Sequence, residues 1–200
     1  NGSINENKCT INGLSNGTEH SYEIEAENNL GLKKKVTGNV TTGNFQSIVI
    51  SESPASANWT DERTLTLSGS AQGQTLEYKL GLGDWTTYTS PIVLRENIGV
   101  YVRISDGVNF SEGVTYLEDK IDTTRPELVL GNVSVTTRSI IIPIETNRDT
   151  ESDIKRTTCK INNQEVTIVN NECKKNDLTN NTSYSYVVET ENNAGLITKI

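Results

Sequence analysis

The chain has 200 residues, of which 33% are hydrophobic, and a formal net charge of −8. The acidic balance argues against nucleic acid as a partner, because phosphate binding needs a basic surface. No apolar run approaches the roughly 18 residues that cross a membrane, so we expect no membrane insertion. The low hydrophobic share predicts several small cores rather than one large core.

The first 42 residues predict only the later strands of a domain. From His20 to Glu27, apolar and charged side chains alternate with the period of two that is typical of a half-buried strand. The Asn and Gly residues of the segment 28–31 favour a turn that reverses the chain into a second strand. We therefore interpret residues 1–42 as the C-terminal half of a domain.

Residues 43–122 predict one complete domain, because seven short apolar stretches are separated by turn-rich pieces. Seven strands at this spacing are typical of a sandwich of two antiparallel sheets. The alternation places Tyr101 and Arg103 on an outward face. The expected inward residues are Val100, Val102, Ile104, Leu65, Leu67, Leu76, Tyr78 and Trp85.

Residues 123–200 predict a third domain, which follows the hinge sequence IDTTRP at 121–126. Pro126 has no amide hydrogen to donate, so a strand can start there but cannot pass through it. Pro143 interrupts the apolar stretch 139–145 and points to an edge strand or a bulge.

The most informative feature is an internal repeat. Residues 9–36 return without a gap as residues 173–200, an offset of 164, and roughly half of the aligned positions are identical. The repeat falls in the middle of a unit at both ends. We therefore expect a window from a longer array, with incomplete first and last units and with neighbouring repeats of the same chain as its partners.

Three cysteines bear on the compartment. Cys159 and Cys173 lie 14 residues apart across an apparent hairpin, and a disulfide there stabilises by about 3 kcal/mol in the chain-entropy model. By the repeat offset, the partner of Cys9 is expected just upstream of Asn1. Such bridges favour an oxidising, extracellular or cell-surface location, and the alternative is three buried thiols in a cytosolic protein.

The repeated segments carry a family resemblance. LTNNTSYSYVVETENNAG from Leu178, and LSNGTEHSYEIEAENNLG from Leu14, resemble the second half of a fibronectin type III domain. The resemblance implies that Tyr184 is the corner tyrosine whose hydroxyl bonds to upstream backbone, with His20 at the same place in the first copy. Residues 43–122 resemble a bacterial immunoglobulin-like repeat. IDTTRP resembles the linkers of bacterial surface proteins.

The predicted fold class is therefore all-β, with tandem immunoglobulin-like or fibronectin III-like sandwiches. Residues 1–42 are the second half of a fibronectin III-like domain, residues 43–122 an immunoglobulin-like domain, and residues 123–200 a fibronectin III-like domain that lacks part of its last strand.

Candidate sites are few. His20 is the only histidine, and with no second His or nucleophile beside it a packed role is expected rather than acid–base catalysis. Asp149, Glu151 and Asp153 alternate along one loop and are candidate calcium ligands; the alternative is a solvated loop. Asp119 and Asp122 near the hinge are a second candidate clamp for an ion.

Three aromatic residues are candidates for ligand binding. Trp85 and Tyr88 are either a sugar-stacking platform or core residues, and the core is the simpler interpretation. Trp59 lies in a polar loop and is the better binding candidate if it is exposed.

No constellation indicates a reaction, so we expect a non-enzymatic protein without a cofactor other than the candidate calcium. The leading hypothesis is a stalk or fibre segment of an extracellular bacterial or phage surface protein, with other copies as partners if it forms a fibre. The alternatives are a module that binds a glycan or a protein, and an accessory segment of a secreted glycoside hydrolase.

Overall fold

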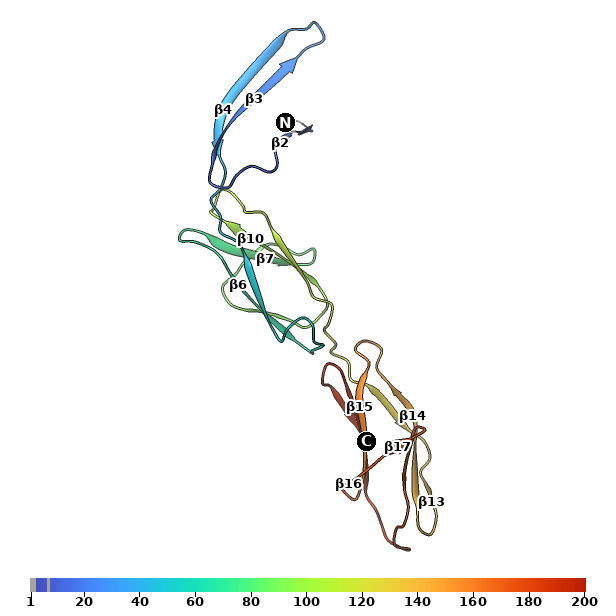
Figure 1. Cartoon of the computed structure of the whole chain (residues 1–200). Coiled ribbons are helices and arrows are strands. Elements are labelled where there is room, and N and C mark those ends of the chain that lie inside the picture. The colour runs from blue at the N-terminus through green and yellow to red at the C-terminus, as the bar shows by residue number, and fades with distance from the viewer. Residues whose placement is uncertain (1–2, 7) are drawn as a thin grey trace. The chain divides into compact units, whose positions relative to one another are not determined.

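The computed structural model describes residues 3–6 and 8–200, and in this part of the chain every regular element is a β-strand (Figure 1). Accordingly, these residues include no helix that is long and apolar enough to cross a membrane. The strands are β1 (Ser3–Asn5), β2 (Lys8–Thr10), β3 (Glu19–Glu27), β4 (Lys33–Thr41), β5 (Val49–Ser53), β6 (Arg63–Ser68), β7 (Thr75–Leu80), β8 (Thr86–Thr87), β9 (Ile92–Leu94), β10 (Gly99–Ser105), β11 (Val114–Leu117), β12 (Glu127–Leu130), β13 (Ser134–Val135), β14 (Ile140–Arg148), β15 (Ile154–Ile161), β16 (Gln164–Val166), β17 (Ile168–Val169), β18 (Glu172–Lys175), β19 (Tyr186–Asn192) and β20 (Ile197–Lys199).

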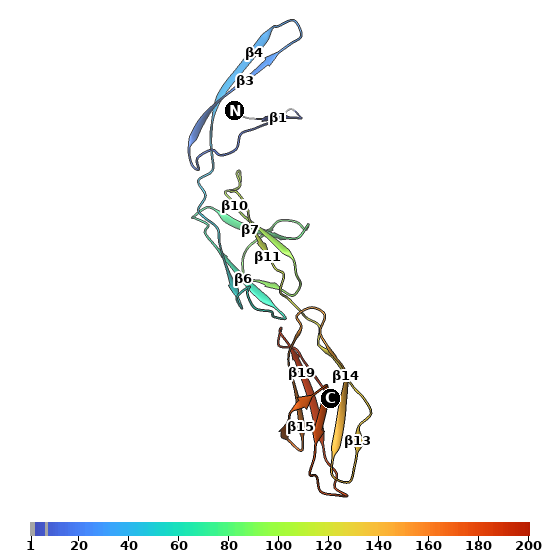
Figure 2. The same ribbon diagram turned by 45° about the vertical axis from the view of Figure 1, so that its right-hand side comes forward.

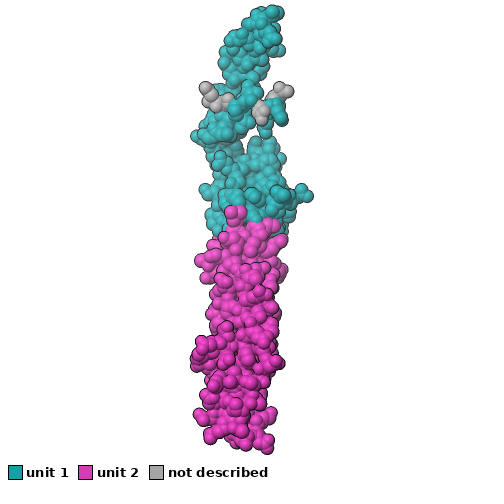
Figure 3. Space-filling model, turned by 90° about the vertical axis from the view of Figure 1, so that its right-hand side faces the viewer, with its two compact units in different colours: residues 1–50, 67–90, 99–116 teal, residues 51–66, 91–98, 117–200 magenta. Residues whose placement is uncertain are grey.

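The chain divides into two compact units (Figure 3). Unit 1 comprises residues 1–50, 67–90 and 99–116. Unit 2 comprises residues 51–66, 91–98 and 117–200. The three domain boundaries expected from the sequence stay predictions.

Unit 1 contains the β3–β4 hairpin, in which every residue from Glu19 to Glu27 pairs with one from Thr41 to Lys33. Its turn is built as the sequence predicts. Gly31 has a φ of +77°, which a residue without Cβ adopts at no steric cost. The Oδ1 of Asn28 accepts hydrogen bonds from the backbone nitrogens of Leu30 and Leu32, at 3.0 Å each.

The larger sheet of unit 1 has the strand order β11-β10-β7-β8. Figure 2 labels its strands β7, β10 and β11. The predicted alternation of β10 is confirmed, because Val100, Val102 and Ile104 are fully buried while Tyr101 is 36% exposed. Trp85 is an exception to the predicted core. Its side chain is 37% exposed, so the core interpretation of Trp85 is wrong.

Unit 2 ends in a sandwich of two sheets. One sheet has the order β12-β14-β18-β17, with β13 also on β14, and the other has the order β16-β15-β19-β20. Their core is a single apolar cluster, which consists of Leu128, Ile142, Ile144, Cys159, Ile161, Cys173 and Val188. This arrangement confirms the predicted all-β, immunoglobulin-like sandwich fold.

The disulfide between Cys159 and Cys173 is present, but it does not close a hairpin. Cys159 lies on β15 and Cys173 on β18, which belong to opposite sheets of the sandwich. Both residues are fully buried. The bond therefore joins the two sheets through the core, and the hairpin interpretation is wrong.

Pro143 does not lie on an edge strand, because β14 pairs with β12 and β13 on one side and with β18 on the other. The Pro143 carbonyl accepts from the backbone nitrogen of Gly131, in the loop between β12 and β13. In an antiparallel ladder the N–H and C=O of one residue face the same neighbour. The N–H that Pro143 lacks would therefore face Gly131, at the point where the neighbour of β14 changes from β13 to β12. The register shift between Val129 and Leu130 lies opposite the stretch from Ile144 to Thr146, which follows Pro143, while Pro143 itself pairs in regular register with Glu172.

Candidate functional site

The segment that the sequence predicts as a hinge is held by hydrogen bonds within unit 2. Ile121 pairs with Thr60, and the backbone nitrogen of Asp122 donates to the Thr60 carbonyl at 2.9 Å. The side chain of Asn97 both donates to the Ile121 carbonyl and accepts from its nitrogen, at 3.1 and 2.7 Å. The start of the hinge is therefore fixed to strand-flanking residues that precede it in the chain.

Asp122 continues this network with its side chain. The carboxylate is fully buried and accepts hydrogen bonds from the backbone nitrogen of Thr124 at 2.8 Å, Ser152 Oγ at 2.6 Å and Asn192 Nδ2 at 2.9 Å. Ser152 lies in the loop after β14, and Asn192 ends β19. One carboxylate thus holds three segments that are far apart in the sequence.

The side-chain amide of Asn192 also forms hydrogen bonds with several segments. Its Nδ2 also donates to the Thr124 carbonyl at 3.0 Å and to Asp149 Oδ2 at 3.1 Å. Its Oδ1 accepts from the nitrogen of Leu196 in the β19–β20 turn, at 2.8 Å. We refer to Asp122, Thr124, Asp149, Ser152 and Asn192 as the Asp122 junction.

The end of the hinge is tied to strand β20. Arg125 donates a guanidinium hydrogen bond to the Ile197 carbonyl. Thr198 Oγ1 donates to the Pro126 carbonyl at 2.6 Å. The segment 121–126 is therefore anchored at its beginning, middle and end, and cannot swing as a free linker.

A buried ion pair lies near the beginning of this segment. Arg63 and Glu118 pair with each other, and their side chains are 0% and 1% exposed. Arg63 also donates to the carbonyls of Pro54 and Asn58. The ion pair joins β6 to the residues just before the hinge. Burial of an ion pair is tolerated because the remaining donors also find acceptors.

Asp122 influences the pKa values of two carboxylates in the loop after β14, those of Asp149 and Glu151. A hydrogen bond with Asp122 raises the pKa of Glu151, with burial and the charges of Asp122 and Asp149 acting in the same direction. For Asp149, burial raises the pKa, but hydrogen bonds from Ser152, Asn192 and Glu151 outweigh it and lower the pKa overall. The loop therefore has one carboxyl that favours its protonated form and one that favours its charged form.

The three predicted calcium ligands are not brought together as a set. Asp149 and Glu151 lie close to Asp122, whereas Asp153 has a φ of +62° and its backbone carbonyl accepts from the nitrogen of Asn193. Among residues 3–6 and 8–200, no group of three or more His, Cys, Asp or Glu side chains is arranged to hold a metal ion. Calcium at this loop, or at Asp119 and Asp122, stays a prediction.

The corner positions of the two repeats are built alike. The hydroxyl of Tyr184 accepts from the backbone nitrogen of Thr179 at 2.9 Å. In the first copy, His20 Nε2 lies 3.4 Å from the carbonyl oxygen of Ser15. Ser15 and Thr179 are equivalent in the repeat, so both side chains lie against the same upstream residue, the phenol at its backbone nitrogen and the imidazole at its carbonyl oxygen. A structural role for His20 stays a prediction.

The aromatic candidates separate into different environments. Tyr88 is half-buried, and its hydroxyl accepts from the backbone nitrogen of Leu67 at 3.1 Å. Trp59 is also half-buried. Trp85 lies on the outer face of the β7–β10 sheet, where the Arg103 guanidinium is 4.0 Å from its ring centre and 3.7 Å from that of Phe110.

Lys79 extends this outer row of aromatic and cationic side chains. Its Nζ lies 5.5 Å from the Trp85 ring centre and 5.1 Å from that of Tyr101. The row is therefore a set of internal cation–π contacts that stabilise the sheet face. The sequence placed Arg103 on the outward face but did not predict its contacts with Trp85 and Phe110, because no local pattern pairs the residue before β8, a residue of β10 and the loop after β10.

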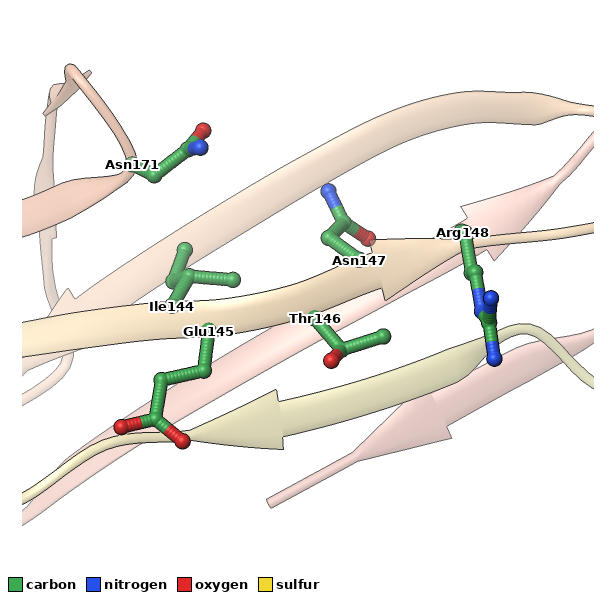
Figure 4. Close-up of a pocket in the computed structure, with 6 residues that line it drawn as sticks. All are labelled: Ile144, Glu145, Thr146, Asn147, Arg148 and Asn171. Atoms are coloured by element: carbon green, nitrogen blue, oxygen red, sulfur yellow. The ribbon is translucent and has the colours of Figure 1, made fainter.

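The hollows on the described surface are shallow, and the largest, of about 870 Å³, lies in unit 1 and has a partly apolar lining that includes Leu14 and Phe110. Another, of about 450 Å³, is lined by side chains along β14 and by Asn171, as Figure 4 shows. Glu145 and Arg148 point to the same side of β14 in this view, away from Asn171.

Comparison with known proteins adds little. No family model matches the chain, and no curated protein matches it. Among solved structures, the crystal structure of the FN1–FN3 domains of chicken CNTN1 is similar at a TM-score of 0.32 and 15% sequence identity, covering 90% of this chain and 76% of that one. Similarity at this level carries no argument about function.

Proposed function

We propose that this protein is a semi-rigid segment of an extracellular stalk or fibre, of the kind found in bacterial or phage surface proteins. The observation that carries the proposal is the Asp122 junction. A hinge between repeats limits bending only when its backbone is fixed on both sides, and residues 121–126 are fixed in this way.

The disulfide supports the same role. Cys159 and Cys173 join the two sheets through the core, so the sheets cannot separate completely while the bond is intact. Buried disulfides in small β-domains are typical of oxidising compartments outside the cell. A sandwich whose sheets are covalently joined resists extension better than one held by packing alone.

A module that binds a sugar through Trp85 is the alternative hypothesis, and the structure offers it less support. The ring of Trp85 already has the cations of Arg103 and Lys79 against it. A sugar that stacks on this ring would have to displace at least one of them.

Single-molecule pulling tests the mechanical role. The full chain is extended from its ends in its oxidised form, and unit 2 should unfold in a distinct force peak. Reduction should lengthen that event by about 44 Å, because the chain between Cys159 and Cys173, a sequence separation of 14, then extends at about 3.6 Å per residue instead of spanning the 6.3 Å between their Cα atoms. The matched control is the double variant Cys159→Ser and Cys173→Ser, which should show the longer event without reductant.

Extension of unit 2 without a force peak would contradict the stalk proposal. A length change that does not depend on reductant would show that the disulfide does not restrict the extension.

A further inference from the structure

The β3–β4 hairpin presents an apolar face that its repeat counterpart buries. Ile24 is 40% exposed, whereas Val188, at the same place in the second copy, is fully buried. Leu14 is 39% exposed, and its counterpart Leu178 is 8% exposed. The same sequence pattern is thus covered in unit 2 and open in unit 1.

The local structure of the two copies is nevertheless the same. Asn28 and Asn192 each accept from a backbone nitrogen at the fourth following residue, and Gly31 and Gly195 each have a positive φ. Ile4 pairs with Cys9 in the β1–β2 hairpin, and its counterpart Ile168 pairs with Cys173 in the β17–β18 hairpin. The hairpins therefore differ in what covers them and not in how they fold.

Unit 2 shows what covers the face in the second copy. The buried side chains that share the core with Val188 come from the strands β12, β14, β15 and β18. Those of β12, β14 and β15 are Leu128, Ile142, Ile144, Cys159 and Ile161. With an offset of 164 residues, the counterparts of β12, β14 and β15 would have numbers below 1, so these 200 residues contain only one copy of those strands.

The cysteines agree with this assignment. Cys173 is fully buried and bonded to Cys159, whereas its counterpart Cys9 is exposed and has a free thiol. Uncovered apolar side chains on one face of a two-stranded sheet are unfavourable, since such a ribbon is marginal in water without a packing partner.

We propose that the apolar face of the β3–β4 hairpin is a docking surface for a sheet segment with the sequence pattern of Glu127–Ile161, which bonds to Cys9 through a cysteine at the place of Cys159. A second copy of this chain is not the partner, because its own segment Glu127–Ile161 already fills unit 2. The docking surface is independent of the mechanical role of the Asp122 junction.

A fusion of the full chain tests the proposal. A copy of residues 122–164 is placed directly before Asn1, which restores the spacing of 14 residues between the copied Cys159 and Cys9. Oxidised glutathione is the oxidant. The two thiols release two protons and two electrons as their sulfurs bond, and glutathione disulfide becomes two reduced glutathione molecules.

The readouts are the thiol titre of the denatured protein and disulfide mapping by mass spectrometry. The parent chain should retain one free thiol, at Cys9, and the fusion should have none, with Cys9 bonded to the copied Cys159. Amide hydrogen exchange of β3 should slow in the fusion. The matched control is the same fusion with Cys159→Ser in the copied segment only, which should keep one thiol but still protect β3.

Three results would overturn the proposal. One is a fusion in which Cys9 stays reduced, or bonds to glutathione, while the native bond between Cys159 and Cys173 forms and shows that unit 2 is folded. Another is exchange of β3 at the parent rate in both fusions. The third is a parent chain that forms dimers through Cys9, with protected β3 amides, which would make a second copy the occupant.

Discussion

Replacement of Asp122 by alanine is expected to destabilise unit 2 by about 3 kcal/mol. The variant leaves Thr124 N, Ser152 Oγ and Asn192 Nδ2 without their shared acceptor. An unsatisfied buried donor costs about 1 to 3 kcal/mol. Ser152 is only 2% exposed and Asn192 is fully buried, so water replaces the lost acceptor poorly.

Two effects reduce the sum of three such penalties. Asn192 Nδ2 keeps its contacts with the Thr124 carbonyl and with Asp149. Removal of the Asp122 charge also relieves the repulsion that contributes to the raised pKa of Glu151. With these two effects, the expected loss in the free energy of unfolding equals the full cost of about one unsatisfied buried donor rather than three, or about 3 kcal/mol.

The assay is urea unfolding followed by the fluorescence of Trp59, the tryptophan of unit 2, in a Trp85→Phe background. Asp119→Ala is the matched control, because Asp119 is an exposed carboxylate of the same segment and should change stability by at most about 0.5 kcal/mol. A cycle with Asn192→Ala should give a coupling of about 1 kcal/mol. A loss below about 1 kcal/mol for Asp122→Ala, or no coupling, would refute the reasoning.

The variant Arg63→Ala should cost about 3 to 5 kcal/mol in the same urea assay, because it leaves the charge of Glu118 buried without its guanidinium. The pair Arg63→Met and Glu118→Leu should recover most of that loss, and an equal loss in both proteins would contradict this account. The raised pKa of Glu151 stabilises the fold fully below the unfolded-state pKa, near 4.5, and the contribution disappears as the pH rises through the folded-state value. Glu151→Gln should therefore gain stability relative to the wild type between pH 4 and pH 7, measured by thermal melting; a constant difference would show that Asp122 does not perturb this carboxyl.

The sequence predicted the features that depend on local pattern. Alternation in β10 identified Val100, Val102 and Ile104 as buried, and the Asn and Gly residues of the repeated turn identified both hairpins. These features follow from the side-chain period of a strand and from backbone sterics at glycine. The disulfide pair was predicted as well, although not the two sheets that it joins.

The Asp122 junction could not be predicted, because its members come from separate parts of the chain. Ser152 lies 30 residues and Asn192 lies 70 residues from Asp122. Nothing in the local sequence of Asn192 distinguishes it from Asn28, which has the same turn but a different environment. Arg63 was missed for the same reason, since Glu118 is 55 residues away.

Trp85 shows a different limit. The prediction placed it in the core because large rings near a strand start are commonly buried in sandwiches. In the structure it precedes the two-residue strand β8, and its ring contacts the outward-facing Arg103. A strand of two residues does not fix which face of the sheet a flanking residue occupies. The residue type of Trp85 therefore predicted the buried face of the sheet, whereas its ring lies on the outer face.

The stiffness of the hinge segment is tested most directly by electron-spin distance measurement between labels at Asp61 and Lys174, two exposed positions of unit 2 on either side of residues 121–126 in the chain. The wild type should give one narrow distance distribution, and Asp122→Ala should broaden it, while Asp119→Ala leaves it unchanged. A broad distribution in the wild type, or an equally narrow one in Asp122→Ala, would contradict the claim that the Asp122 junction holds this segment rigid.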